Sequence, residues 1–286
     1  MNYKKLKVGY QVENVNYDSQ EDANKIKELI GEGRLVVVKN NNPVSAKNLV
    51  SLYKKIGDVV AQSDKVVGSG VEGYQELVRV RANGLFKGAE DGELEWHSAG
   101  MNRHGAEDVV AMYMNKPAES GGDTYFSDFQ SAYEDYEDKD TIDSLQSKMR
   151  TYSDERSLKA KHYEKVFNDE ETYRNFKDID GVAAHTKEVE TKNLVTTHPI
   201  NNKKGFYYPW VVIRGFDGMD RRQSHKTYFE IKDHVMSDKY IYKHKWDNYD
   251  ICLSDQHHSL HRRDAYDGDR ELWRAGIWYR SEVAST

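Results

Sequence analysis

The sequence predicts a mainly β fold with flanking helices, of the sandwich or jelly-roll type. Short β-branched or alternating segments recur along the chain, helical periodicity is restricted to a few segments, and strands lie on both sides of one long charged segment. The chain has 286 residues, of which 37% are hydrophobic, and this suffices for one domain with a sizeable core. We therefore expect a single domain over residues 1–286.

The N-terminal part predicts two helices on either side of a buried strand. Residues 18–33 place apolar side chains at helical spacing, begin with Asp or Ser as a cap, and end in glycines. Residues 35–39, LVVVK, are too short and too β-branched for a helix and predict a strand. Residues 45–57 predict the second helix, which Ser45 begins and Gly57 ends.

The rest of the chain predicts further strands around a helical insertion. Strands are expected at 74–82, 108–116 and 123–128, where apolar or alternating runs end at turn residues. From about 128 to 190 the sequence becomes charged and helical, which is typical of an insertion or lid. Beyond it, strands are expected at 193–200, 205–215 and 277–283, and a helix followed by a strand at 221–246.

Composition and charge exclude several classes of function. The formal net charge is −6 and basic residues alternate with acidic ones, so the sequence lacks the positive surface that nucleic-acid binding requires. No run of about 18 apolar residues is present, and no apolar segment follows the N-terminal lysines, so we expect neither a membrane span nor a signal peptide. The single cysteine, Cys252, fits a reducing compartment. We therefore expect a cytoplasmic protein.

Three separated segments carry the residues that suggest chemistry. They are EWHSAG at 95–100, GGDTYFSD at 121–128, and a stretch rich in histidine and arginine at 255–279. One histidine alone indicates little, because most histidines are surface or core residues. Together the segments provide imidazoles, a hydroxyl and two arginines, which are the groups that Fe(II) and a dicarboxylic oxo acid require.

In order and spacing these segments resemble the taurine-dioxygenase-like branch of the iron(II)/2-oxoglutarate-dependent oxygenases. The matching residues are Trp96-His97, Gly121-Gly122-Asp123-Thr124 after Pro117, Asp255 with His261, and then Arg270 with Arg274. The resemblance covers most of residues 34–280 and implies a double-stranded β-helix, the cupin-like jelly roll, which uses Fe(II), 2-oxoglutarate and dioxygen as cosubstrate. It assigns His97 and His261 to the metal, and Thr124 and Arg270 to 2-oxoglutarate.

The second metal ligand has alternatives in the sequence. His257 and His258 stand close to His261, and His198 lies at the edge of a predicted strand. The family pattern favours His261, which directly precedes the basic pair at 262–263.

The third ligand of the family, a carboxylate two residues after the first histidine, aligns with Ala99, whose methyl group cannot coordinate a metal. Aliphatic halogenases of this family carry the same change, and chloride then binds the iron in place of the carboxylate. The resemblance therefore implies chlorination of an unactivated C–H, in which a hydrogen atom is removed and the carbon radical takes chlorine. Ala99 would mark the halide position.

Other interpretations of Ala99 remain open. Water could fill the position in a hydroxylase, with Glu95 or Asp123 assisting; Glu95 stands two residues before His97 and is expected on the same strand face. The protein could also bind 2-oxoglutarate without catalysis, or Ala99 could be an engineered change in an ordinary hydroxylase.

Residues near the open ligand position predict a small polar substrate. Arg274 lies four residues after Arg270, so both face the same side of a strand and Arg274 could bind an anionic group of the substrate. Arg79, on the strand at 74–82, and Asn102 are further candidates, with a surface position as the alternative for Arg79. We expect a free amino acid or nucleotide; a substrate tethered to a carrier protein is less favoured, because no carrier domain is attached.

Overall fold

Two antiparallel β-sheets form the framework of the computed structural model, which describes residues 1–61, 70–81, 92–99, 106–150 and 189–279. The larger sheet has eight strands, in the order β1 (Asn2–Lys5), β2 (Tyr10–Glu13), β3 (Leu35–Val38), β16 (Ile251–Asp255), β7 (Val109–Lys116), β19 (Glu271–Ile277), β5 (Tyr74–Arg81) and β4 (Gly70–Val71). The smaller has four strands, in the order β15 (Ile241–His244), β9 (Thr124–Ser127), β17 (His261–Arg263) and β6 (Leu94–His97). Short strands β8 (Ser120–Gly121) and β18 (Tyr266–Asp267) pair with each other.

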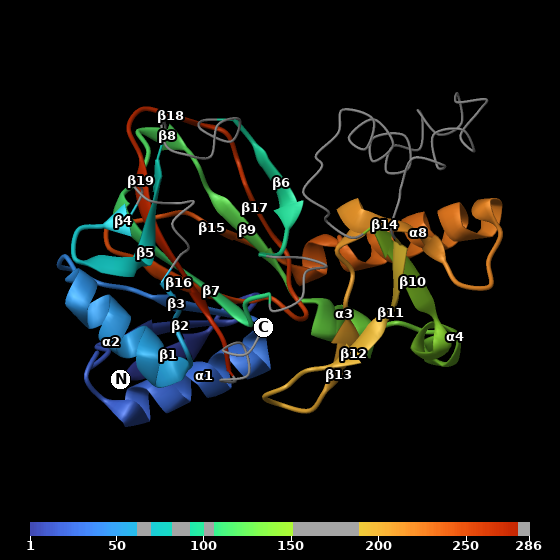
Figure 1. The fold of residues 1–286 in the computed structure, drawn as a ribbon, viewed down its shortest axis with the longest axis horizontal. Coiled ribbons are helices and arrows are strands. Elements are labelled where there is room, and N and C mark those ends of the chain that lie inside the picture. Colours follow the sequence, from blue (N-terminus) through green and yellow to red (C-terminus); the bar gives the residue numbers. More distant parts are fainter. Residues whose placement is uncertain (62–69, 82–91, 100–105, 151–188, 280–286) are drawn as a thin grey trace.

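Strands from distant parts of the chain are neighbours in both sheets (Figure 1). Strand β16, from the last part of the chain, lies between β3 and β7, and β17 lies between β9 and β6. All of the sheet pairings are antiparallel except that of β2 with β3. This crossed-over, two-sheet arrangement is the jelly roll that the sequence predicts, and the prediction of the fold class is confirmed.

Two helices cover the outer face of the larger sheet, as predicted. The helix α1 (Gln20–Gly33) begins at Ser19, whose hydroxyl accepts a hydrogen bond from the amide of Asp22, and α2 (Ala46–Ile56) begins at Ser45 in the same way. Their apolar faces pack on β3 and its neighbours in one cluster of buried side chains. The four residues of β3 are all buried, which explains the unbroken β-branched run in the sequence.

A second cluster fills the space between the two sheets. It contains Val110 and Met112 from the larger sheet, Phe126 from the smaller one, and the buried free thiol of Cys252. Ala99 packs against this cluster from the end of β6. The inner faces of the sheets therefore meet at the segment where the sequence places its open ligand position.

A second layer of structure lies beside the jelly roll and has its own buried cluster (Figure 1). It comprises α3 (Phe129–Glu134), α4 (Lys139–Ser144), β10 (Gln146–Arg150), β11 (Val189–Asn193), β12 (Val195–Thr197), β13 (Lys204–Phe206), η2 (Trp210–Val212), β14 (Ile213–Phe216), α8 (Arg221–Val235) and η3 (Asp238–Tyr240). The strand β10 pairs with both β11 and β14.

The structure corrects two expectations in this layer. Residues 146–150 form a strand and not part of a helix, because Ser147 and Met149 alternate as buried residues between β11 and β14. The strand expected at 205–215 is divided by η2, which begins after Pro209, a residue without the amide hydrogen that a central strand needs. The larger part of the expected lid, 151–188, lies outside the described residues.

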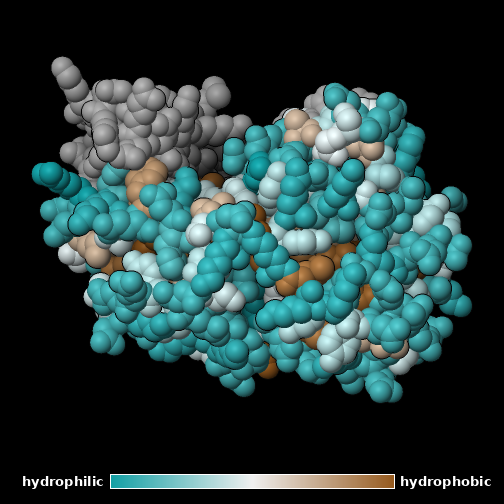
Figure 2. Space-filling model, turned by 180° about the vertical axis from the view of Figure 1, so that it is seen from behind, coloured by the Kyte–Doolittle hydropathy of each residue, from teal (hydrophilic) through white to brown (hydrophobic). Residues whose placement is uncertain are grey.

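The surface on the face shown in Figure 2 is predominantly hydrophilic, with small hydrophobic patches. Within the described ranges, none of the helices combines the length and apolar character that crossing a membrane requires.

Candidate metal and oxo-acid site

The two histidines that the sequence assigns to a metal lie opposite each other on neighbouring strands. His97 ends β6, His261 begins β17, and the two residues are in register. Their ring centroids are 4.3 Å apart. His261 is also in register with Phe126, whose side chain packs in the cluster between the sheets, so this face of the small sheet is the interior face.

Both imidazoles are held in the neutral form that a metal requires. Burial lowers the pKa of His97, and the positive charges of Arg274 and Arg263 lower it further, against the hydrogen bond to the carbonyl of Glu95. Burial likewise lowers the pKa of His261 well below its usual value. Nδ1 of His97 lies 2.7 Å from that carbonyl oxygen, which can only accept, so Nδ1 carries the proton and Nε2 keeps its lone pair.

His261 has a ring nitrogen still to be satisfied. Its buried Nδ1 has no hydrogen-bond partner among the described residues. Buried polar atoms in proteins normally have a hydrogen-bond or metal partner. The unpartnered Nδ1 of His261 and the neutral state of both imidazole rings are therefore consistent with a pair of metal ligands.

The three other candidate histidines are engaged elsewhere. His198 contacts Asp255 through Nε2 at 3.0 Å and accepts from the amide of Ile200 through Nδ1. His257 lies 2.6 Å from a carboxylate oxygen of Asp108, and His258 lies 3.0 Å from the hydroxyl of Thr196. Of the four candidates, only His261 stands opposite His97.

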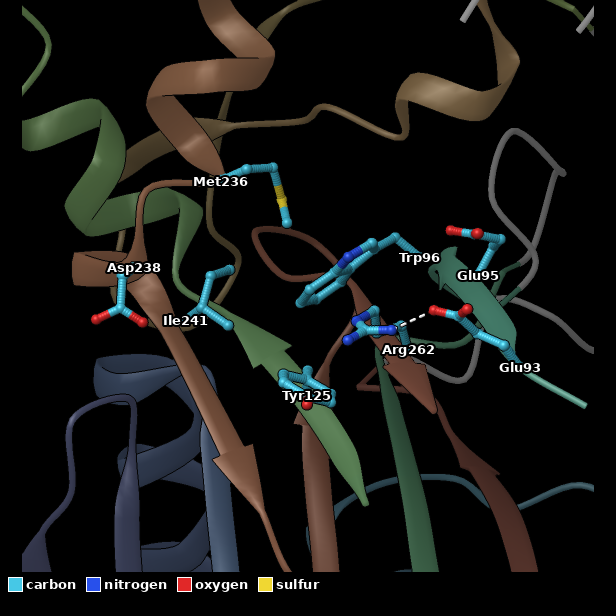
Figure 3. A pocket seen from close by; sticks show the side chains of 8 residues that line it. All are labelled: Glu93, Glu95, Trp96, Tyr125, Met236, Asp238, Ile241 and Arg262. Carbon is cyan, nitrogen blue, oxygen red and sulfur yellow. Dashed lines mark hydrogen bonds and ion pairs between the residues drawn. The ribbon is translucent and has the colours of Figure 1, made fainter. Parts of the chain in front are cut away.

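The side chain of Glu95 does not share the face of His97. His261 pairs with His97 but Arg263 pairs with Leu94, so β6 has one more residue than β17 between these pairs. Glu95 and Trp96 therefore both oppose Arg262, and both line a pocket on the outer surface of the small sheet (Figure 3). The expectation that Glu95 could assist a metal from the same face is wrong, because the bulge reverses its direction.

No carboxylate takes the place of the missing ligand in the part of the chain that the structure describes. Asp123 lies 3.1 Å from the ammonium group of Lys243, next to Asp264 on the outer side. No group of three or more His, Cys, Asp or Glu side chains that could hold a metal occurs in the described ranges. The amide of Ala99 donates to Oε1 of Gln256 at 2.6 Å, which fixes the backbone at the third ligand position.

A cluster of buried cationic side chains suited to an oxo-acid carboxylate lies on the same interior face. Arg270 and Arg263 are 3% and 6% exposed, and both guanidinium groups lie over the ring of Tyr266, at 5.4 and 4.7 Å from its centroid. Burial and the charge of Arg263 lower the pKa of Arg270 to about 10. None of the ion pairs within the described residues involves Arg270, so its charge has no protein counter-ion there.

Thr124 lies beside this cluster and is held in place by Trp246, a residue that the sequence does not indicate. Thr124 is buried and in register with Arg263. Its Oγ1 accepts a hydrogen bond from the indole nitrogen of Trp246 at 2.9 Å, which leaves the hydroxyl hydrogen free to donate. Gly122, with φ +73°, adopts a backbone conformation that favours glycine, and Tyr266 packs tightly on it; a methyl there would lie 3.2 Å from Cβ of Tyr266.

Of the three residues predicted to bind the substrate, Arg274 and Arg79 do not lie together in the structure. Arg274 is in register with Met112, on the interior face, and donates from Nη2 to Oε1 of Glu107 at 2.6 Å. Arg79 is in register with Trp273, which packs in the cluster under the helices, so Arg79 lies on the opposite face of the sheet from Arg274 and is not a neighbour of it in the interior. Asn102 lies outside the described residues.

Comparisons with known proteins agree with this geometry. The family model described as taurine catabolism dioxygenase TauD, TfdA family, matches residues 2–275. The structure of AAD-2 in complex with Mn(II) and N-oxalylglycine matches with a TM-score of 0.67 and 17% identity, over 98% of each chain. A taurine dioxygenase from Burkholderia xenovorans matches with a TM-score of 0.73 and 15% identity, over 98% of this chain and 89% of that one. No curated protein matches the chain. At these identities the solved structures show the shared fold.

Proposed function

Because this chain belongs to the taurine catabolism dioxygenase TauD, TfdA family, it is an Fe(II)/2-oxoglutarate-dependent oxygenase, and we propose that it halogenates an unactivated C–H bond. The observation that carries the proposal is Ala99, which stands where the family places its carboxylate ligand. Glu95 and Asp123 both point to the outer side of the small sheet, and Glu107, inside the jelly roll, is paired with Arg274. The open position is then available to a chloride ion.

Different residues of this chain would bind the metal and the 2-oxoglutarate in such a reaction. His97 and His261 would hold the iron, and Arg270 and Thr124 would bind the distal carboxylate of 2-oxoglutarate. Trp246 orients the Thr124 hydroxyl for this contact. When bound, iron and 2-oxoglutarate supply, with dioxygen, the oxidising power that removes a hydrogen atom from the substrate. The apolar cluster between the sheets keeps water away from the reacting carbon.

The overall reaction balances without a further reductant. A substrate C–H, chloride, 2-oxoglutarate, dioxygen and one proton give the C–Cl product, succinate, carbon dioxide and water. The protein decides between chlorine and hydroxyl through the position of the substrate carbon, which is a matter of orientation. We propose a free small polar metabolite as substrate, with Arg274 as the residue that binds its anionic group; a carrier-bound substrate is the less favoured alternative.

Hydroxylation with water at the open position is the second candidate function. The matched solved structures favour it, since one of them is named a taurine dioxygenase. A protein that binds 2-oxoglutarate without catalysis is disfavoured because it would need the buried Thr124 and Arg270 but not the facing histidine pair His97 and His261.

Product masses from matched variants at position 99 distinguish these functions. The protein with Ala99 and the Ala99→Gly variant both leave the ligand position open, so both should incorporate chlorine, or bromine when bromide replaces chloride. The Ala99→Asp variant supplies a carboxylate and should lose the halogenated product. Incorporation of oxygen alone by the unaltered protein at high chloride would refute halogenation and support the hydroxylase.

The assignment of the chain as an Fe(II)/2-oxoglutarate-dependent oxygenase has an independent test. Anaerobic addition of Fe(II) and 2-oxoglutarate should produce a visible charge-transfer absorption band, and the His261→Ala variant should abolish it. A folded protein without this band would contradict the metal site itself.

A further inference from the structure

Arg274, the residue predicted to bind the substrate, already has a carboxylate partner inside the jelly roll. Its Nη2 donates to Oε1 of Glu107 at 2.6 Å. Glu107 belongs to the segment between β6 and β7, which sequence reasoning did not single out. The pair therefore presents one positive and one negative group to whatever binds beside the two histidines.

The fold makes room for Glu107 at this point. Arg274 and Gly276 lie on the same face of β19, opposite Met112 and Val110 of β7, which both belong to the cluster between the sheets. A methyl group on Gly276 would lie 2.4 Å from Cγ of Glu107. Because Gly276 lacks a side chain, Glu107 can extend across the interior face of the strand to reach Arg274.

The charge pair lies near the candidate metal ligands and is accessible. Arg274 lies opposite Met112, which belongs to the cluster between the sheets, and Ala99, two residues after His97, packs against the same cluster. The side chains of Arg274 and Glu107 are 23% and 13% exposed, so the pair is neither sealed in the core nor free at the surface. Each head group keeps unused hydrogen-bonding capacity within the described residues, since only Nη2 and Oε1 are engaged.

We propose, on the basis of the proposed function, that the substrate is an α-amino acid whose carboxylate binds Arg274 and whose ammonium group binds Glu107. An anion without a cationic group would place its charge next to the Glu107 carboxylate, which repels it. An amine without an anionic group would meet the same repulsion from Arg274. An α-amino acid carries its two charges on one carbon, and so matches two protein groups that touch each other.

Binding measured without turnover tests this assignment. The full chain is loaded with Mn(II) and 2-oxoglutarate under anaerobic conditions, and ligands are titrated by calorimetry. The probes are the common L-amino acids and one matched set: L-norleucine, hexanoate, hexylamine and 6-aminohexanoate. At least one α-amino acid should bind at least tenfold more tightly than its analogues that lack either charge, and 6-aminohexanoate, with separated charges, should bind as weakly as those analogues.

Two variants test whether the preference for amino acids depends on Glu107. Glu107→Gln should weaken binding of the preferred amino acid at least tenfold and should improve binding of the corresponding carboxylic acid. Gly276→Ala should weaken amino-acid binding without changing any charge, because the added methyl displaces Glu107. Glu230→Gln, on the exposed face of α8, is the control and should leave the affinity for every probe unchanged.

The outcomes separate this inference from the proposed function. Failure of the protein to bind Mn(II) and 2-oxoglutarate at the loading step would refute the proposed function. Normal loading followed by no amino-acid preference, or by equal binding of a carboxylic acid and its amino acid, would overturn the inference alone. Unaltered selectivity in Glu107→Gln would also overturn it.

Discussion

Asp255 holds the segment that leads to His261 through buried contacts, and its replacement by Asn should strongly lower the free energy of unfolding. The Asp255 carboxylate is fully buried and contacts the fully buried guanidinium of Arg34 at 3.4 Å, Nε2 of His198 at 3.0 Å and the amide of His258 at 2.7 Å. Two further nitrogens of Arg34 have no hydrogen-bond partner among the described residues. The Arg34 charge therefore depends on Asp255.

The expected loss in the free energy of unfolding is about 3–5 kcal/mol, because the variant leaves a buried charge without its counter-ion. With a urea dependence of about 3 kcal/mol per M, this lowers the urea midpoint by roughly 1–1.7 M. Asp247→Asn is the matched control: its ion pair with Lys39 is shorter, at 2.6 Å against 3.4 Å for Asp255 with Arg34, but the Asp247 side chain is 74% exposed. The Asp247→Asn control should lower the free energy of unfolding by at most about 1 kcal/mol.

The effect of Asp255→Asn should also depend on pH in a defined direction. Burial alone raises the pKa of Asp255, but the hydrogen bond from His198 and the charge of Arg34 outweigh burial and lower it well below its usual value. Because the pKa in the folded state lies below that in the unfolded state, about 3.9, the stabilisation is present above about pH 4 and is lost as the pH falls below it. Urea denaturation from pH 7 to pH 3 measures this. A loss no larger than that of the control at pH 7 would refute the reasoning.

Four further predictions concern the site and its surroundings. Arg270→Met should raise the dissociation constant of 2-oxoglutarate at least 100-fold by calorimetry, since it removes a buried cation that the described residues leave without a counter-ion; an unchanged constant would contradict the assignment. Trp246→Phe should raise the same constant about fivefold, about 1 kcal/mol, because Thr124 loses the hydrogen bond that orients it. Burial lowers the pKa of His258 to about 3, so the unfolded state takes up a proton first as the pH falls below 6.5, and His258 alone should lower the stability by about 2 kcal/mol between pH 7 and 5. His97, His198 and His261, whose pKa values are also lowered, add to this slope, so His258→Gln should reduce the total loss in urea titrations by about 2 kcal/mol and not abolish it. Glu95→Gln should leave metal affinity and turnover within twofold of the unaltered protein, and a larger loss would mean that Glu95 reaches the interior.

Local patterns in the sequence predict the elements that are defined within a few residues. The capped helices α1 and α2, the buried strand β3 and the strands β5, β7 and β9 follow from periodicity and turn residues. The pairing of His97 with His261 follows from the resemblance, because no local signal connects residues so far apart in the chain. The strand β10 is the exception, since its charged composition hides a period-two alternation that only its partners β11 and β14 make visible.

The features that sequence reasoning missed depend on register and on contacts between distant segments. One additional residue in β6 reverses the direction of Glu95, and such a bulge has no mark in the sequence. The face of Arg79 relative to Arg274 is set by the pairing of β5 with β19, which strand prediction alone cannot supply. Glu107 and Trp246 lie outside the predicted motifs, and only the fold brings them to Arg274 and Thr124.

The charges around the two histidines connect the halide proposal with the amino-acid proposal. Neutral imidazoles give no charge to a metal, and Ala99 removes the negative charge that a carboxylate would contribute. In the proposed halogenase, a chloride ion would supply the negative charge that the missing carboxylate does not. Arg274 and Glu107 form an ion pair without net charge, so a substrate that bears only a negative charge would add an uncompensated charge beside the proposed halide. An amino acid bound across Arg274 and Glu107 would add no net charge, and so would not compete with the proposed halide.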